Sequence, residues 1–282
     1  MKIKPMLLHN YRKYSHKILY PAFVQPKYDG LRVIAQLTKS GKVNLITRQG
    51  NIITNLSHIN KDLKKLFKHF KLNKNIYFDG EIFTRHLIPE HFKSINRITK
   101  LTDKAKKKIS LLKFYIFDFF NLKNMGLEFS QRRHILSKIK KKYKHIKVVK
   151  TFVVNNEKEF FQYHKKFVKK GYEGSVIRNM YGKYNIGKRD FNVQKYKDYY
   201  DDEFKIIGYK EGFGKDKGTP IFECDCRGTS EIFYVRPKGT YKERRKMFKN
   251  IKSLIGKKIN VRYVRLSEYG CPIEPVGMFI VY

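Results

Sequence analysis

The sequence predicts an α+β fold whose strands pair mostly antiparallel, followed by a smaller β-rich domain. Short segments rich in β-branched and aromatic residues recur along the chain. Helical patterns fall between them without the regular strand–helix–strand alternation of a parallel sheet. After about residue 198 the helical patterns become rare and glycine-rich turns become frequent. We therefore expect two domains, at residues 1–199 and 200–282.

Three helices are predicted in the first domain. Asn55–Phe70 places its apolar residues near one face, as in an amphipathic helix. Ser130 is the expected N-cap of a basic helix that runs to about Tyr143. The helix over Glu157–Gly171 is expected to end with Gly171 in the position after the C-cap. The expected strands of this domain are Leu31–Leu37, Val43–Thr47, Ile76–Phe78, Phe114–Phe119, Val148–Val154 and Ser175–Arg178.

The second domain is predicted to be a small barrel. A β-barrel of the OB type has this size and composition and often binds nucleic-acid backbone. One helix is expected near Lys242–Leu254, and the acidic, tyrosine-rich stretch Asp198–Asp202 is the expected boundary. The expected strands are Phe204–Tyr209, Glu231–Val235, Lys258–Val264 and Met278–Val281, with turns at Gly212, Gly214, Gly218 and Gly228.

The chain is strongly basic. It has 63 Lys and Arg against 24 Asp and Glu, a formal net charge of +39. A cation that neutralises a phosphate releases counterions, so this excess indicates a nucleic-acid partner. An A+T-rich genome also favours Lys over Arg, but it does not explain why acidic residues are scarce. With 41% hydrophobic residues the chain is not generally disordered. No apolar run approaches the roughly 18 residues of a membrane span.

Three cysteines, Cys224, Cys226 and Cys271, are too few for a disulfide framework or a CxxC-type zinc site. In a strand, Cys224 and Cys226 would share one face, and we expect them to be small packing residues. The first ten residues stop being apolar too soon for a secretory signal. These features predict a soluble protein of a reducing compartment.

The strongest chemical signal is Lys27-Tyr-Asp-Gly-Leu-Arg32. A lysine beside a turn glycine, with Asp29 and Arg32 close by, can surround one phosphate with three functional groups. To act as a nucleophile near neutral pH, the Lys27 amine must lose its proton from a reference pKa of about 10.4. A nearby divalent cation or other cationic side chains would disfavour the ammonium form. A turn with an ordinary surface Lys–Asp pair is the alternative for this hexapeptide alone.

Acidic residues in two later segments predict a metal site. Asp79 and Glu81 are expected to flank a glycine turn, and Glu173 follows a helix and precedes a strand. Two carboxylates from separate turns suit Mg²⁺ or Mn²⁺, which take oxygen ligands and leave room for water and phosphate. Taken singly, each acid is better explained as an exposed residue in a turn.

Six segments, in this order, resemble the covalent nucleotidyltransferase superfamily and specifically the small ATP-dependent DNA ligases of viral and phage type. They span residues 27–197. The segments are Lys27–Arg32 (K-x-D-G-x-R), Arg48–Gly50 (R-x-G), Asp79–Glu81 (D-G-E), Phe117-Asp118 (F-D), Glu173–Arg178 (E-G-x-x-x-R) and Lys195–Lys197 (K-x-K).

The resemblance implies a three-step reaction. Lys27 attacks the α-phosphate of ATP and releases pyrophosphate, AMP passes to the 5′-phosphate at a nick, and the 3′-hydroxyl displaces AMP to seal the strand. Each step is an in-line displacement at phosphorus, which needs positioned oxygens and neutralised charge. The implied cofactors are ATP and Mg²⁺ or Mn²⁺, and the implied partner is nicked duplex DNA. The resemblance also implies a viral monomer that acts in DNA repair, replication or recombination, in the host cytoplasm or nucleus or with the virion.

Motif matching gives the implied roles of the site residues. Asp29 would help organise the site around Lys27. Arg32 and Arg48 would hold the 5′-phosphate, for which a guanidinium fork is suited. Glu81 and Glu173 would contact the metal and the ribose, and Phe117 would stack on adenine, although core packing explains Phe117 equally well. The expected nucleotide-binding residues are Gln25, Tyr28, Arg32, Glu81, Phe117, Lys195 and Lys197.

The implied fold is a nucleotidyltransferase domain with ATP-grasp-like antiparallel sheets and helices, followed by a C-terminal OB-fold barrel. The last strand departs from the family pattern. Many relatives end with an Arg that orients pyrophosphate, whereas Met278–Tyr282 contains no basic residue. Either a nearby cation substitutes for it or the first step is slow. The candidate substitutes are Lys257, Lys258, Arg262 and Arg265.

Two kinds of alternative remain at the level of sequence. An RNA ligase or an mRNA capping guanylyltransferase of the same superfamily uses the same lysine chemistry, the latter with GTP. A non-catalytic, basic nucleic-acid-binding protein would account for the charge and for the missing Arg. It would not account for Asp29, Glu81 and Glu173, which would repel DNA unless metal or ribose occupied them.

Overall fold

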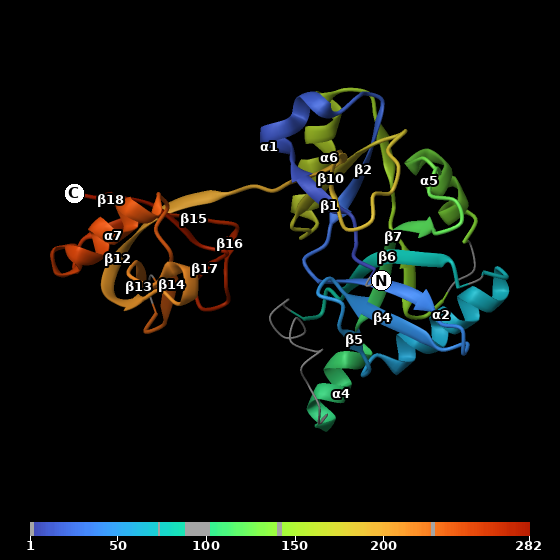
Figure 1. Cartoon of the computed structure of the whole chain (residues 1–282), viewed down its shortest axis with the longest axis horizontal. Coiled ribbons are helices and arrows are strands. Elements are labelled where there is room, and N and C mark those ends of the chain that lie inside the picture. Colours follow the sequence, from blue (N-terminus) through green and yellow to red (C-terminus); the bar gives the residue numbers. More distant parts are fainter. Residues whose placement is uncertain (1–2, 73, 88–101, 140–142, 227–228) are drawn as a thin grey trace. The chain divides into compact units, whose positions relative to one another are not determined.

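The computed structural model describes residues 3–72, 74–87, 102–139, 143–226 and 229–282. The chain divides into two compact units, Met1–Tyr196 and Lys197–Tyr282 (Figure 1). We describe each unit by itself.

The first unit contains two sheets. The chain alternates between them, and neighbouring strands are antiparallel except in the β1–β11 and β7–β8 pairs. The predicted mixed fold with mostly antiparallel sheets is confirmed for this unit. One sheet has the order β1 (Leu7–Asn10), β11 (Arg189–Tyr196), β10 (Gly174–Asn179), β2 (Ala22–Lys27), β9 (Phe152–Val154). The other has the order β5 (Ile52–Ile53), β4 (Val43–Thr47), β3 (Leu31–Leu37), β6 (Ile76–Phe83), β7 (Lys113–Asn121), β8 (Ile146–Val148).

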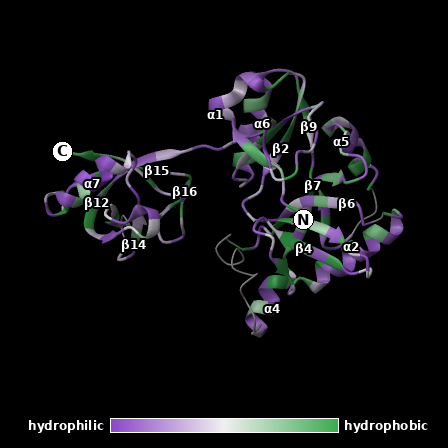
Figure 2. Ribbon diagram, viewed as in Figure 1, coloured by the Kyte–Doolittle hydropathy of each residue, from purple (hydrophilic) through white to green (hydrophobic). Residues whose placement is uncertain are grey.

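Amphipathic helices cover the sheets of the first unit. In α2 (Ser57–His69) the apolar face, including Leu63 and Phe67, is buried in the larger core. In α6 (Glu157–Lys169) the Asn156 side chain caps the first turn and Gly171 follows the C-cap with φ +77°, as predicted. Figure 2 shows hydrophobic and hydrophilic residues mixed along such elements, as one buried face requires. The described helices are too short and too polar to cross a membrane. The remaining helices of this unit are α1 (Tyr11–Tyr14), α4 (Asp103–Ser110) and α5 (Phe129–Ser137).

The prediction of a glycine turn at Asp79–Glu81 is wrong, because these residues belong to one continuous strand, β6, which ends at Phe83. β6 lies between β3 and β7, and its pairing with β7 shifts register between Asp79 and Gly80. A Cβ at Gly80 would lie 2.4 Å from the Tyr115 carbonyl oxygen. Gly80 therefore permits a close approach of two strands within a bulge, and the glycine signal alone resembled that of a turn.

Two further boundaries were also mispredicted. The expected strand Val148–Val154 is two strands, β8 and β9, that belong to different sheets. The helix α5 begins two residues earlier than Ser130 implied, because Gln131 accepts a hydrogen bond from the Glu128 backbone in a capping box. It ends at Ser137 rather than near Tyr143, and residues 140–142 lie outside the described part of the chain.

The second unit is built around one five-stranded sheet. Its core includes Phe204, Phe222 and Ile259. β14 and β18 are the outer strands, and an isolated parallel bridge joins Pro237, just after β14, to Gly277 in β18. No continuous ladder closes a barrel in the described residues, and Gly228 lies outside them. The sheet order is β14 (Ile232–Val235), β13 (Pro220–Asp225), β12 (Tyr200–Glu211), β15 (Lys258–Tyr263), β18 (Val276–Val281). The unit also contains the helix α7 (Tyr241–Lys249), a 3-10 turn (Ile251–Leu254) and a hairpin of β16 (Arg265–Leu266) and β17 (Pro272–Ile273).

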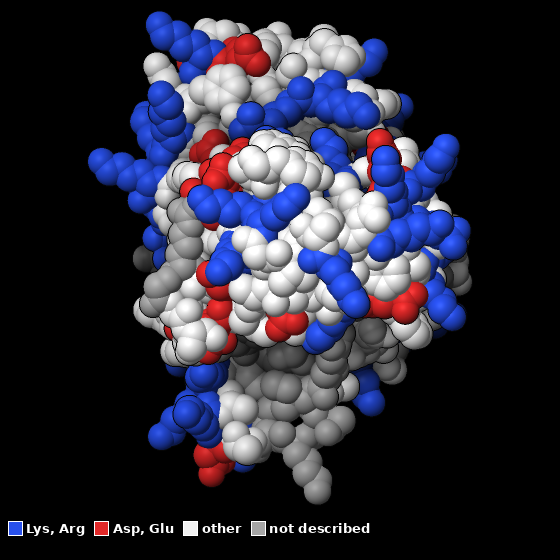
Figure 3. Space-filling model, turned by 90° about the vertical axis from the view of Figure 1, so that its left-hand side faces the viewer, with Lys and Arg blue, Asp and Glu red and all other residues white. Residues whose placement is uncertain are grey.

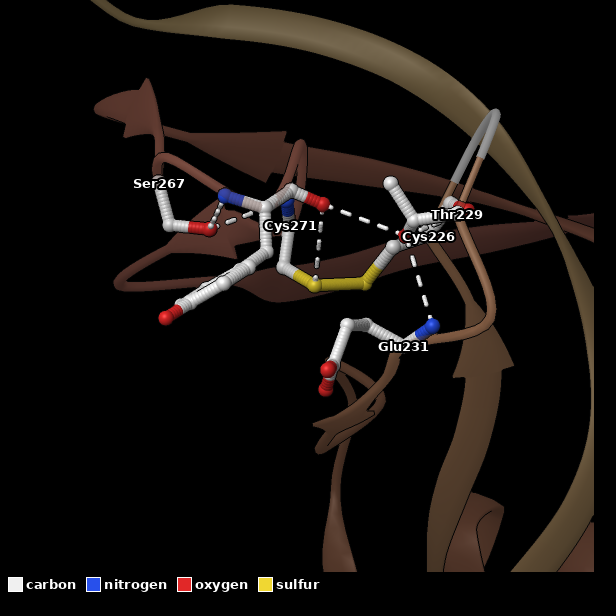
Figure 4. Close-up of a disulfide and its surroundings, with 6 residues drawn as sticks. Cys226, Thr229, Glu231, Ser267 and Cys271 are labelled. Atoms are coloured by element: carbon white, nitrogen blue, oxygen red, sulfur yellow. Dashed lines mark hydrogen bonds between the residues drawn. A yellow bond between two sulfur atoms is a disulfide. The ribbon is translucent and has the colours of Figure 1, made fainter.

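A disulfide joins Cys226 to Cys271 in the second unit (Figure 4). Our expectation that Cys226 is only a small packing residue was therefore wrong. The two cysteines are 45 residues apart in sequence but lie at the end of β13 and at the base of the β16–β17 hairpin. Cys224 and Cys226 are both buried, as expected of strand residues on one face, and Cys224 remains a free thiol.

Candidate active site

Strand register brings the two strongest motifs together. Lys27 is the last residue of β2, and it pairs with Gly174 at the start of β10. The Glu173 backbone nitrogen donates to the Lys27 carbonyl oxygen at 3.0 Å. The Lys27 ammonium also donates to a carboxylate oxygen of Glu173 in an ion pair. The proposed nucleophile and a proposed metal ligand therefore lie side by side although 146 residues separate them.

Gly30 allows Glu81 to join this pair. A Cβ at Gly30 would lie 2.3 Å from the Ile82 carbonyl oxygen and 2.7 Å from Glu81 Cγ. Only a glycine lets β6 pass this close to the turn between β2 and β3. In the β3–β6 pair, Glu81 lies opposite Arg32. Gly30 of K-x-D-G is thus required because a side chain there would collide with Glu81 of D-G-E.

These residues line one cavity with a volume of about 240 Å³. Among the charged side chains that the structure describes in its wall, cations far outnumber the one acid, Glu81, which suits a phosphate ligand. Arg178 and Arg189 contribute to this positive lining in addition to the predicted residues. Of the residues predicted from sequence, those that line the cavity are Gln25, Lys27, Tyr28, Arg32, Arg48, Glu81, Phe117 and Lys195.

A fully buried carboxylate orients Arg32. Arg32 Nε and Nη2 donate to the two oxygens of Asp79 at 3.0 and 2.6 Å. The Tyr184 hydroxyl donates to Asp79 Oδ2 at 2.6 Å. A bidentate pair inside the protein restricts a guanidinium to one orientation. Arg32 therefore reaches the cavity with one edge already held by Asp79.

A second buried carboxylate, Asp118, supports the floor of the cavity. It accepts hydrogen bonds from Arg132 Nε at 2.8 Å and from Arg178 Nη1 at 2.9 Å. Arg178 Nε also donates to Gln25 Oε1 at 3.0 Å, and Gln25 Nε2 donates to the Phe117 carbonyl oxygen at 3.1 Å. The amide of Gln25 is thus engaged in holding β2 against β7.

Two aromatic residues of the cavity differ in their surroundings. Phe117 is partly exposed, and the guanidinium carbons of Arg32 and Arg178 lie 5.3 and 5.7 Å from its ring centroid. Tyr28 is buried, and its ring centroid lies 4.7 Å from that of Tyr115. Burial raises the pKa of the Tyr28 hydroxyl above its ordinary value. The ring of Phe117 is therefore the more accessible stacking surface.

Three predicted residues are placed differently from the rest. Glu173 adjoins the cavity through its ion pair with Lys27. Asp29 is half-buried beside Gly30, and it is not part of the cavity wall that the structure describes. Lys197 belongs to the second unit, where its ammonium donates to Glu274 Oε2 at 3.0 Å. The two lysines of K-x-K thus have separate surroundings.

Glu81 is electrostatically unusual. Burial raises its pKa to about 8; the cations Lys27 and Arg32 lower it, and the nearby acids Glu173 and Asp79 raise it further. Near neutral pH the Glu81 carboxyl is therefore largely protonated. Additional positive charge at this position would ionise it.

A divalent cation fits this donor set. Glu81 and Glu173 supply two carboxylates next to an open cavity, and oxygen ligands suit Mg²⁺. Within the described residues there is no group of three or more His, Cys, Asp or Glu arranged to hold a metal. An ion held by Glu81 and Glu173 would complete its shell with water and phosphate oxygens, as Mg²⁺ commonly does.

Sequence reasoning missed several residues of the site. Leu7, Leu8 and Arg189 line the cavity from β1 and β11, strands that we did not predict. Asp79 and Asp118 were noted only as parts of motifs, although both are fully buried and paired with arginines. For Asp118 the signal was an acid between aromatic strand residues, Phe117-Asp118-Phe119, because such an acid must have a buried cationic partner.

The family model described as ATP dependent DNA ligase domain matches residues 5–197. This chain belongs to that family. The match includes every residue that lines the cavity and all six sequence motifs. The second unit lies almost entirely beyond it.

One relative agrees in sequence with membership of the ligase family, and two solved structures share the fold. The DNA ligase of African swine fever virus (isolate Tick/South Africa/Pretoriuskop Pr4/1996) is 31% identical over 266 residues, which cover 89% of this chain and 61% of that protein. This chain thus spans less than two thirds of the length of that relative. Among solved structures, Pmar-Lig_PreS3 is similar with a TM-score of 0.81 at 20% identity, covering 99% of this chain and 68% of that one. A Lig E DNA ligase structure has a TM-score of 0.74 at 18% identity and covers 99% of both chains.

Proposed function

We propose that this chain is an ATP-dependent DNA ligase that seals nicks between a 3′-hydroxyl and a 5′-phosphate in duplex DNA. The observation that supports it most is the shared cavity of Lys27, Glu81, Arg32 and Arg48, with Glu173 paired to the Lys27 ammonium. A strand-end lysine surrounded by cations and two carboxylates is suited to attack on phosphorus. Membership of the ligase family supports ATP and DNA as its substrates.

Lys27 is the proposed nucleophile. Its ammonium must lose a proton before the nitrogen can bond to the α-phosphorus of ATP. Glu173 is hydrogen-bonded to that ammonium and is positioned to accept the proton. As the nitrogen–phosphorus bond forms, the bond from the α-phosphorus to the bridging oxygen breaks and pyrophosphate leaves with that oxygen. The product is lysyl-AMP.

Other residues of the cavity would position the nucleotide. Phe117 offers a partly exposed ring for adenine, between two guanidinium groups. Tyr28 and Gln25 would form the wall behind it. Lys195 would neutralise the α-phosphate. Lys197 is the proposed second cation for that phosphate, and it would have to exchange Glu274 for it.

Arg32 and Arg48 are the proposed ligands of the 5′-phosphate at the nick. Arg32 is pre-oriented by Asp79, and Arg48 is exposed at the end of β4. The wider surface is suited to DNA, because Lys and Arg far outnumber Asp and Glu on the face shown in Figure 3. We propose that the chain binds nicked duplex DNA as a monomer, mainly through phosphate contacts.

Mg²⁺ is the proposed cofactor, held by Glu81 and Glu173. When bound, such an ion supplies positive charge to the phosphate oxygens during displacement. The raised pKa of Glu81 supports this assignment, because the carboxyl needs a neighbouring cation to be ionised at neutral pH. Asp29 is proposed to organise the turn that holds Lys27 near these two acids.

We propose that the second unit is an OB domain and that the two domains comprise residues 1–199 and 200–282. Its five main strands pair so that β12 lies between β13 and β15, and α7 falls between β14 and β15 in sequence. The Pro237–Gly277 bridge joins the two outer strands at one point. These features are those of a partly open five-stranded barrel.

We also propose that a nearby cation of the second unit replaces the missing terminal Arg. Lys258 pairs with Glu203 at 3.3 Å and Arg262 with Asp201 at 2.9 Å, both at the surface. Such exposed pairs exchange readily for phosphate, since they contribute little stability. Lys257 and Arg265 are the other two candidates. Unchanged lysyl-AMP formation in the Lys257→Ala/Lys258→Ala double variant would remove that pair.

The decisive test is covalent labelling. The chain is incubated with Mg²⁺ and α-labelled ATP or GTP and then run on a denaturing gel. We expect label from ATP alone, lost in Lys27→Ala and kept in Lys39→Ala, a control on an exposed turn. Label from GTP would indicate a capping guanylyltransferase. If no label appears even after bound AMP has been stripped with pyrophosphate, the ligase proposal is wrong.

A further inference from the structure

Phe213 is the most exposed large apolar side chain that the structure describes. It is 97% exposed at the turn between β12 and β13, whereas Phe204, Phe222 and Phe233 of the same unit are buried. Water contact of a whole phenyl ring is unfavourable, by roughly 25 cal/mol for each Å² of apolar surface. At this exposure nearly the whole ring is available for contact with a partner.

The turn that presents Phe213 is well ordered by hydrogen bonds. The Gly212 nitrogen donates to the Thr219 carbonyl oxygen at 2.8 Å, which closes the base of the turn. The Asp216 nitrogen donates to the Phe213 carbonyl oxygen at 3.2 Å. Gly212 is needed there, because a Cβ would lie 2.4 Å from the Asp216 carbonyl oxygen. Gly214 follows Phe213 with φ +61°, so the ring stands on a narrow tip between two glycines.

The surroundings of the tip are positively charged. Lys215 and Lys217 are exposed on the turn itself. The Tyr241 hydroxyl donates to the Lys217 carbonyl oxygen, which places the start of α7, with Lys242 and Arg245, beside the turn.

The acids near the tip do not cancel this charge. Asp216 accepts from Arg236 Nη2 at 2.6 Å and from Arg244 Nη1 at 2.8 Å. Glu211 accepts from the Gly218 nitrogen at 2.8 Å, and Glu243 caps α7 through Thr240. The tip therefore combines one apolar ring with a surplus of exposed cations, a combination that suits a polyanion with apolar interior surfaces.

We propose that Phe213 is an apolar wedge that enters the minor groove of the DNA duplex and partly unstacks one base step, while the neighbouring lysines contact phosphates. This inference rests on the proposed function, which supplies duplex DNA as the partner. The minor groove is only about 6 Å wide, so a narrow tip is required to enter it. Phenylalanine is one of the side chains that minor-groove proteins insert between base steps.

The test measures binding of the full chain to a nicked duplex that ends in a 3′-dideoxynucleotide and so cannot be sealed. Affinity is measured by fluorescence anisotropy over a range of salt concentrations. 2-Aminopurine, placed in turn at successive positions around the nick, reports local unstacking. The variants are Phe213→Ala and, as a matched control, Tyr282→Ala, which removes an aromatic ring that is 92% exposed outside the turn.

We expect Phe213→Ala to raise Kd about tenfold, in line with the loss of one aromatic–base contact. The slope of log Kd against log salt should not change, because the phenyl ring displaces no counterions. Lys215→Ala should instead lower that slope by about 1. The 2-aminopurine signal near one step should disappear in Phe213→Ala alone. Tyr282→Ala should behave like the wild-type chain.

The proposal is overturned if Phe213→Ala binds the nick as tightly as the wild-type chain, or if Tyr282→Ala loses as much affinity. It is also overturned if Phe213→Ala lowers the melting temperature or slows lysyl-AMP formation without DNA, since a fully exposed wedge contributes to neither. Failure of the ligase proposal is distinguishable. A wild-type chain that forms no lysyl-AMP would contradict that function, while the binding measurement on the unsealable nick would still decide the role of Phe213.

Discussion

The two units use charged residues in opposite ways. In the first unit Asp79 and Asp118 are fully buried, and each accepts bidentate hydrogen bonds from an arginine. In the second unit the ion pairs have partly exposed acids, with Asp216 at 26% and Glu274 at 58%, and in Arg262–Asp201 both side chains are exposed, at 45% and 38%. Buried pairs fix the geometry of a site, whereas exposed pairs leave cations available to other anions. The first unit is therefore organised around a fixed cavity and the second around an adaptable surface.

The largest effect is expected from breaking the Asp118 network. Asp118→Ala would leave Arg132 and Arg178 buried without their carboxylate. We expect the free energy of unfolding of the first unit to fall by about 3–5 kcal/mol, measured by urea denaturation. Asp201→Ala, which removes an exposed partner, should cost less than about 1 kcal/mol. Equal losses in the two variants would contradict the contrast between the units.

The second unit should depend most on its disulfide. The Cys226–Cys271 bond closes a loop of 45 residues, and loss of such a bond typically costs about 2–4 kcal/mol. We expect Cys271→Ser to lower the melting temperature of the second unit and to leave that of the first unchanged. A reducing agent should have the same effect on the wild-type chain and none on Cys271→Ser. Insensitivity of the wild-type chain to reduction would show that the bond does not stabilise the unit.

The raised pKa of Glu81 should make the stability of the first unit depend on pH. Its pKa is about 8 in the folded chain and near the ordinary 4.5 in the unfolded chain, so the folded state binds more protons between these values. Stability from this group is therefore fully present below pH 4.5 and is lost as pH rises towards 8. We expect the melting temperature of the metal-free first unit to fall over this range, and to fall less in Glu81→Gln. Parallel profiles for the two proteins would show that Glu81 titrates normally.

The smallest effect is expected at the surface of the second unit. A double-mutant cycle on Lys258→Ala and Glu203→Ala should give a coupling energy of about 0–1 kcal/mol, because both side chains are largely exposed. Thermal denaturation of the four proteins would measure it. A coupling near that of a buried pair would mean that this surface is not free to exchange its partners for phosphate.

Much of the fold could be predicted from local patterns. The strands Leu31–Leu37 and Val43–Thr47 have the expected bounds. The helix α2 lies where periodicity placed it, and α6 ends before Gly171 as expected. The short β1 and the charged β11 were missed, because Leu7–Asn10 and Arg189–Tyr196 show no clear apolar alternation. They become strands by pairing with each other, a contact between distant segments that no local pattern records.

The candidate site likewise contains residues that could be predicted from the sequence and contacts that could not. Lys27, Arg32 and Glu81 could be predicted because their motifs give both residue types and spacing, and the structure brings them into one cavity. The Asp79–Tyr184 hydrogen bond joins residues 105 apart and could not be predicted from spacing. The Cys226–Cys271 bond was missed for the same reason, since its partners meet only when the sheet forms.

The most direct test of the proposed function follows the AMP group from protein to DNA. The chain is labelled with α-labelled ATP, freed of excess nucleotide and mixed with a duplex containing one nick. We expect the label to leave Lys27, to appear on the 5′-phosphate and then as free AMP, with one sealed strand formed for each lysyl-AMP consumed. Label that stays on the protein while the nick remains open would contradict the assignment of this cavity to DNA ligation.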